Sequence, residues 1–159
     1  MLTVGRTAIG IGDEGGFAPP ISHPVEALDL LTSAVKKAGH EGKVKFAMDP
    51  ASSEFFKDGQ YYDLGFKVKE SKLLSKKELE DLYLSLTRDY PIILLEDPFA
   101  EDDWEAWQSF KKVCPVELVG DDLLATNVER IELAKEKDAC TSLLLKINQI
   151  GSITESIAA

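Results

Sequence analysis

The chain has 159 residues, 44% of them hydrophobic, which is enough for one core of ordinary size. Its 18 basic and 28 acidic residues give a formal net charge of -10, which argues against a nucleic-acid or anionic-membrane surface and is compatible with bound divalent cations. There is no signal-peptide pattern and no apolar run of membrane length. Cys114 and Cys140 have no C-x-x-C spacing and are expected to be buried thiols, which is typical of a reducing compartment. Together these features predict a cytoplasmic protein with neither a membrane nor a nucleic-acid partner.

The first motif along the chain is GIGDEGG, residues 10–16, which contains the G-x-G-x-x-G pattern of dinucleotide-binding loops. A phosphate site of that kind needs a helix that opens directly behind the glycines, and the following Phe-Ala-Pro-Pro cannot open one. Asp13 and Glu14 would also repel a phosphate. Taken locally, the residues favour a surface turn with solvated acids.

Four short apolar runs predict strands. They lack the polar alternation of a half-exposed strand, which is typical of strands buried on both faces of a parallel sheet. These runs lie at residues 44–48, 92–96, 116–120 and 142–147. Helical patterns lie before and between them, at residues 24–39, 75–89, around Trp104 and Trp107, and at 126–137. The alternation indicates a βαβ architecture, in which the strands are expected to be parallel and adjacent in chain order.

Three capping-box patterns of the type S/T-x-x-E predict helix starts, with Ser75, Thr126 and Ser152 as the N-cap residues. The last of these would open a helix at about Ile153. The chain ends soon afterwards at Ala159, with no stop signal for the helix. We therefore expect the sequence to be truncated.

Residues 50–74 interrupt the alternation of strands and helices with a long insertion. Inside it, Asp58-Gly59 lies between aromatic strand formers, which predicts a β-hairpin. An insertion at the carboxyl end of a strand is compatible with an active-site flap and equally with a loop that has no function.

Acidic residues follow or end three of the predicted strands: Asp49, then Glu96-Asp97, then Asp121-Asp122. The carboxyl ends of neighbouring parallel strands share one face, so these carboxylates are expected to converge. Each acid alone is more often a helix cap or a loop residue, and only their occurrence on successive strands favours a bound cation. Because no His or Cys cluster accompanies the acids, Mg²⁺ is the best candidate.

Lys146 lies in the fourth apolar run, LLLKIN, at the level of these acids. A lysine buried in a strand is costly to charge, so its pKa is expected to fall and to suit a general base. Alternatively, this lysine pairs with one of the acids and takes no part in chemistry.

Five segments resemble the enolases, the family of glycolytic phosphopyruvate hydratases. They occur in the family's order and cover nearly the whole chain from Gly12 onward: GDEGGFAP, ASSEFFKDG, LEDPFAEDDWEAW, GDDL followed by ATN, and LLLKINQIGSITESI. The resemblance implies an α/β fold, namely an incomplete TIM (β/α)8-type barrel that represents part of the enolase C-terminal domain. Residues 1–159 would be one partial barrel domain, with the N-terminal domain and the last barrel strands missing.

The resemblance also implies roles for single residues. Asp49, Glu96 and Asp121 match the magnesium ligands, and Glu96 and Asp121 match residues close to the substrate. Lys146 matches the base that removes the C2 proton of 2-phosphoglycerate, and Glu14 matches the acid that helps the C3 hydroxyl group to leave. An enolase-type Lys base with Mg²⁺ is a known scheme for this superfamily.

The implied activity is the Mg²⁺-dependent dehydration of 2-phosphoglycerate to phosphoenolpyruvate, by a protein that is a homodimer at full length. Asp97 and Asp122 match family positions and are expected to support the ligands. A chain that lacks the family's later phosphate-binding residues is expected to be inactive alone. The alternatives are a truncated, non-catalytic product or binding relic of an enolase, and a superfamily member that acts on a different carboxylate.

Overall fold

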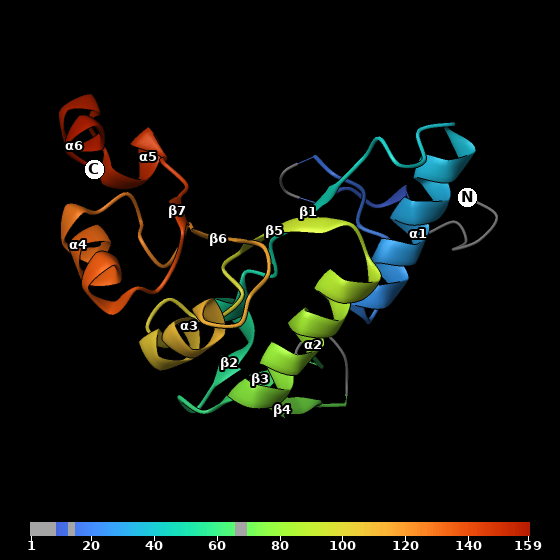
Figure 1. Cartoon of the computed structure of the whole chain (residues 1–159), viewed down its shortest axis with the longest axis horizontal. Coiled ribbons are helices and arrows are strands. Elements are labelled where there is room, and N and C mark those ends of the chain that lie inside the picture. Colours follow the sequence, from blue (N-terminus) through green and yellow to red (C-terminus); the bar gives the residue numbers. More distant parts are fainter. Residues whose placement is uncertain (1–8, 13–14, 66–69) are drawn as a thin grey trace. The chain divides into compact units, whose positions relative to one another are not determined.

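The computed structural model (Figure 1) describes residues 9–12, 15–65 and 70–159. The chain divides into two compact units, residues 1–41 and 42–159. The strands that carry the candidate site all lie in the second unit.

The described part of the first unit contains a reverse turn and a helix. Ile11 and Phe17 form an antiparallel bridge, and the N–H of Gly12 donates to the carbonyl oxygen of Gly16 at 2.9 Å. Helix α1 (Pro24–Lys37) begins several residues after this turn. The glycines are therefore not followed directly by a helix N-terminus, which agrees with the rejection of a dinucleotide-binding loop.

A four-stranded parallel sheet forms the centre of the second unit, in the order β1-β5-β6-β7. The strands are β1 (Phe46–Met48), β5 (Ile92–Glu96), β6 (Glu117–Gly120) and β7 (Ser142–Leu143). Their parallel pairing in chain order confirms the prediction. A (β/α)8 barrel has eight such strands, and over the described residues this sheet does not close, so the fold is an incomplete α/β barrel.

One α-helix lies in the connection between each successive pair of parallel strands, as predicted. These helices are α2 (Lys76–Asp89), α3 (Trp104–Lys111) and α4 (Val128–Lys137). Strand and helix side chains share the core, since Leu118 of β6, Leu79 of α2 and Trp107 of α3 are all fully buried. Phe99 packs edge-to-face against Phe110 of α3, with 5.4 Å between the ring centroids. Aromatic pairs in this arrangement stabilise the fold by more than the burial of their apolar area alone.

The predicted helix caps are correct at two positions and wrong at the third. Ser75 and Glu78 form a complete capping box at the start of α2, and Ser152 caps α6 (Ile153–Ala158). Helix α4 is capped by Asn127, whose side chain accepts from two backbone N–H groups, and not by Thr126. Thr126 has a positive φ of 50°, so its hydroxyl points to other partners.

The insertion after β1 forms a short 3-10 helix and a separate antiparallel sheet, in the order β2-β3-β4. The elements are η2 (Ser52–Phe55), β2 (Phe56–Lys57), β3 (Tyr61–Asp63) and β4 (Leu73–Ser75). The predicted hairpin is confirmed, since β2 and β3 pair antiparallel across a turn in which Asp58 and Gly59 have φ values of 52° and 68°. Positive φ at both central residues is typical of a tight hairpin turn.

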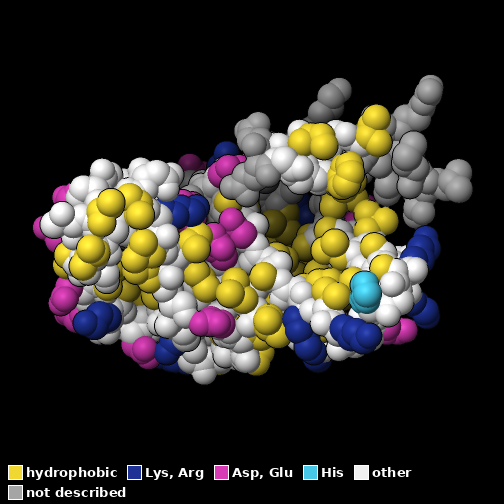
Figure 2. Space-filling view, turned by 90° about the horizontal axis from the view of Figure 1, so that it is seen from above, with side chains coloured by type: hydrophobic (Ala, Val, Ile, Leu, Met, Phe, Trp, Pro, Cys, Tyr) yellow, Lys and Arg dark blue, Asp and Glu magenta, His cyan; other side chains and the backbone are white. Residues whose placement is uncertain are grey.

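The last two helices, α5 (Ile147–Ile150) and α6, leave apolar side chains on the surface. Figure 2 shows hydrophobic side chains gathered over this end of the second unit. Ile153 and Ile157 are 66% and 81% exposed. Contiguous exposed apolar side chains are typical of a surface that packs against further protein.

The cysteine prediction needs a correction. Cys114 and Cys140 are free thiols, as expected, but both are half-buried rather than buried. Partial burial still raises the pKa of both thiols, which makes them poor nucleophiles. Separately, among the described helices none has both the length and the apolar character needed to cross a membrane.

Candidate functional site

The strand-end acids lie near one another at the carboxyl ends of the strands, but the three predicted ligands do not form a single group. Asp49 follows β1, Glu96 ends β5 and Asp121 follows β6, and these strands are neighbours in the parallel sheet. The carboxylates form two overlapping groups, Asp49 with Glu96 and Asp97, and Asp97 with Asp121 and Asp122. Within each group, one oxygen per residue lies within 4.8 Å of the others, a spacing at which a shared cation would relieve the repulsion.

Asp97 joins the two groups and organises the turn after β6. Its side chain is 2% exposed, and its carboxylate accepts hydrogen bonds from the N–H groups of Asp121 at 3.2 Å, Asp122 at 2.7 Å and Leu123 at 3.4 Å. The three predicted ligands are thus divided between two groups that Asp97 connects. The supporting role expected for Asp97 agrees with these contacts, which orient a neighbouring ligand.

Lys146 lies beside Asp121. Its Nζ donates a hydrogen bond to Asp121 Oδ2, and Gln149 Nε2 donates to the other oxygen, Oδ1, at 2.7 Å. The expectation of a lysine buried in a strand is wrong, because β7 ends at Leu143 and the Lys146 side chain is 37% exposed. Lys146 instead precedes α5 as its N-cap residue, which leaves the ammonium group beside the acids and open to solvent.

Thr126 and Gln149 belong to the site, although sequence reasoning missed both. The Thr126 Oγ1 accepts from the N–H of Lys146 at 2.9 Å and donates to Gln149 Oε1 at 3.0 Å. Thr126 is fully buried, so this hydroxyl fixes the turn that carries the lysine. The S/T-x-x-E pattern around Thr126 predicts a helix cap, and the sequence holds no signal that separates a capping hydroxyl from one that fixes a turn.

Glu96 and Asp97 hold protons more tightly than free acids do. Burial, followed by repulsion from Asp49 and Asp121, raises the pKa of Glu96 from its ordinary 4.5 to about 7. Burial raises the pKa of Asp97 to about 6, even though the N–H of Asp122 lowers it. At neutral pH the cluster therefore either retains protons or requires a cation to stay fully ionised.

These raised pKa values predict how metal binding depends on pH. A metal competes with protons for the carboxylates, so the affinity for Mg²⁺ should fall by up to about tenfold per pH unit below pH 7 for each proton displaced. Calorimetric titration with Mg²⁺ at pH 6, 7 and 8 measures this. An affinity that stays constant across this range would show that neither Glu96 nor Asp97 changes protonation on binding.

Glu14, the predicted acid, lies outside the described residues. Its nearest described neighbours in the glycine turn, Gly12 and Gly15, are linked by a hydrogen bond of 2.9 Å from the N–H of Gly15 to the carbonyl oxygen of Gly12. The described geometry therefore concerns the predicted ligands and Lys146 alone.

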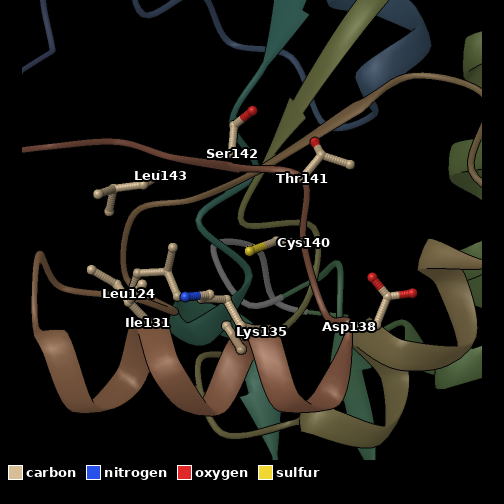
Figure 3. Close-up of a pocket in the computed structure, with 9 residues that line it drawn as sticks. Leu124, Ile131, Lys135, Asp138, Cys140, Thr141, Ser142 and Leu143 are labelled. Atoms are coloured by element: carbon tan, nitrogen blue, oxygen red, sulfur yellow. The ribbon is translucent and has the colours of Figure 1, made fainter. Parts of the chain in front are cut away.

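A pocket of about 320 Å³ lies between α4 and β7 (Figure 3). Cys140, Lys135 and Asp138 are among its lining residues. None of the strand-end acids lines it. The pocket is therefore separate from the carboxylate cluster, and among the described residues the groups of acids that could hold a metal ion all belong to that cluster.

Comparison with known protein families agrees with this arrangement. The family described as "Enolase, C-terminal TIM barrel domain" matches residues 2–159, which is nearly the whole chain. The barrel architecture that this family name describes agrees with the parallel strands and their connecting helices. The chain belongs to the family of enolase C-terminal TIM barrel domains.

Proposed function

We propose that this chain belongs to an enolase, which dehydrates 2-phosphoglycerate to phosphoenolpyruvate with the help of Mg²⁺. The observation that carries the proposal is the hydrogen bond from Lys146 Nζ to Asp121 within the two overlapping carboxylate groups. A basic side chain and several acids meet where parallel strands end, which is where barrel enzymes place their active sites. The ASSEFF and EDDWEAW segments favour enolase among the members of its superfamily.

The donor chemistry of the cluster fits magnesium. Both groups offer carboxylate oxygens only, and hard oxygen donors suit Mg²⁺ better than they suit zinc. Asp49, Glu96 and Asp121 are the proposed ligands, with Asp97 as their support. Mg²⁺ bound there would supply positive charge next to the substrate carboxylate.

Lys146 is the proposed base. The C2 proton of 2-phosphoglycerate is a very weak acid, because its removal places further negative charge on the neighbouring carboxylate group. Lys146 Nζ, after its ammonium form has lost a proton to solvent, would take this proton, while Glu14 would give a proton to the C3 hydroxyl group. The C2–H and C3–O bonds break, the C2=C3 double bond forms and one water leaves, so atoms and charges balance.

The proposal is tested in a chimera in which residues 1–159 replace the corresponding segment of an active enolase. We expect the chimera to form phosphoenolpyruvate, followed by its absorbance, only when Mg²⁺ is present. The parent enolase is the positive control, and circular dichroism checks folding. A folded chimera that binds Mg²⁺ but does not convert 2-phosphoglycerate would overturn the enolase assignment and favour another carboxylate substrate.

A further inference from the structure

Ser52 connects the end of β1 to the loop that follows β5. It begins η2, three residues after Asp49, and is fully buried. Its N–H donates to the carbonyl oxygen of Asp97 at 3.3 Å, and its Oγ donates to the carbonyl oxygen of Pro98 at 2.9 Å. The Tyr83 hydroxyl lies 3.2 Å from the same Oγ. Ser52 therefore holds two successive carbonyl groups of the β5 loop, that of Asp97 through its backbone N–H and that of Pro98 through its side chain.

Asp97 passes this restraint on to the turn after β6. It has a positive φ of 39°, a conformation that an aspartate keeps only when its surroundings enforce it. Its N–H donates to the carbonyl oxygen of Val119 at 3.1 Å. Its carboxylate accepts hydrogen bonds from the N–H groups of Asp122 and Leu123 at 2.7 and 3.4 Å. The contacts run without a gap from Ser52 to the residues around Asp121.

The described part of the insertion is fixed to the same loop at a second place. The Tyr62 hydroxyl of β3 donates to Asp103 Oδ2 at 2.9 Å and accepts from the N–H of Ala100 at 3.0 Å. Tyr62 is fully buried and Asp103 is 5% exposed. Buried hydrogen bonds whose donors and acceptors are all paired make a structure more rigid. Through Tyr62, this part of the insertion therefore restrains the loop after β5 at Ala100 and Asp103.

We propose that Ser52 is a positioning residue, which holds Asp97 in place so that Asp97 can orient the Asp121 turn for metal binding. The inference rests on the proposed function in that it treats the strand-end carboxylates as metal ligands. Removing a residue that orients a metal ligand typically lowers the affinity for the metal by about tenfold or more. Nothing in the motif ASSEFF distinguishes Ser52 from its neighbour, so the structure alone makes this assignment.

Ser53 provides a matched control. Its Oγ accepts a hydrogen bond of 3.0 Å from the N–H of Glu101, which lies farther along the same loop. Ser52→Ala and Ser53→Ala each delete one hydroxyl group and one hydrogen bond to the loop. Only Ser52→Ala removes a contact to Pro98, next to Asp97.

The first readout is amide hydrogen exchange in the metal-free protein, measured by NMR. In Ser52→Ala, the amides of Asp122 and Leu123 should exchange about tenfold faster, because the hydroxyl contacts to Pro98 and Tyr83, which oppose local opening, are lost. In Ser53→Ala they should change by no more than about twofold. Equal acceleration in both variants, or none in Ser52→Ala, would overturn the proposal. If Ser52→Ala does not fold, Ser52→Cys, which keeps a weak donor, carries the same comparison.

The second readout is the affinity for Mn²⁺, followed by its electron paramagnetic resonance signal as a probe of the Mg²⁺ site. Ser52→Ala should weaken binding about tenfold and Ser53→Ala should leave it within about twofold. Equal affinities in the two variants would refute the positioning role. Absence of metal binding by the unmodified protein would refute the proposed function instead, while the exchange experiment would still decide whether Ser52 fixes the turn.

Discussion

Replacing Lys146 by alanine in the enolase chimera should slow exchange of the C2 proton of 2-phosphoglycerate with solvent by on the order of 10²–10⁴-fold, the usual contribution of a general base. Mg²⁺ binding should remain largely intact. Gln149 Nε2 still holds Asp121 Oδ1 at 2.7 Å after the lysine is removed, so the ligand keeps its orientation. Exchange is followed by NMR in deuterated water, and metal binding by calorimetry.

Lys146→Arg is the matched control for charge. Arginine keeps a positive group beside Asp121 but does not give up its proton at accessible pH, so it cannot act as a base. Both Lys146→Ala and Lys146→Arg should therefore lose exchange. Loss of Mg²⁺ binding together with retained exchange would identify Lys146 as a structural partner of Asp121, and the base would then have to be sought elsewhere.

The parallel sheet could be predicted from the sequence because its signals are local. The run at residues 92–96 is apolar up to its final Glu96, and the run at 116–120 has one charged residue, Glu117, so both predict strands of a parallel sheet. The coverage is less complete than this pattern predicts, since Glu117 is exposed and Ile93 is 54% exposed. The fourth run misled, since its apolar residues continue to Ile147 while β7 ends at Leu143. Hydrophobicity alone cannot distinguish a strand from the extended segment that leads into the next helix.

The convergence of the acids could also be predicted, because it follows from topology once the strands are parallel. The support around them could not. Asp97 acts through a backbone conformation with φ of 39° and through N–H groups that lie more than 20 residues away in the sequence. Thr126 resembles a helix cap in the sequence, yet its buried hydroxyl holds the turn of Lys146. Such long-range contacts leave no periodic pattern.

Replacing Glu96 by glutamine should have two effects of opposite sign. The affinity for Mg²⁺ should fall by at least about tenfold, since the loss of a ligand matters no less than the loss of its support. The metal-free protein, however, should become more stable at pH 8. There the Glu96 carboxylate is ionised at a cost, because burial and the charges of Asp49 and Asp121 raise its pKa to about 7.

The pH dependence separates this explanation from a simple packing effect. The pKa of Glu96 is higher in the folded state than its ordinary 4.5, so the folded protein binds the proton more tightly and the stability lost at pH 8 returns as the pH falls from about 7. Near pH 4.5 the neutral glutamic acid and the glutamine should therefore differ little. Urea unfolding of both proteins at pH 8 and near pH 4.5, without metal, measures the difference in the free energy of unfolding.

Magnesium should then reverse the order of stability at pH 8. A ligand that binds only the folded state stabilises it by RT ln(1 + [L]/Kd), so the protein that binds Mg²⁺ more tightly gains more. Saturating Mg²⁺ should make the unmodified protein the more stable of the two. Glu132→Gln, at an exposed position on α4, is the control and should show neither the gain nor the reversal. If Glu96→Gln is stabilising at pH 8 with and without Mg²⁺, Glu96 is an acid that does not bind the metal. The acids left to form the site would then be Asp49, Asp97, Asp121 and Asp122.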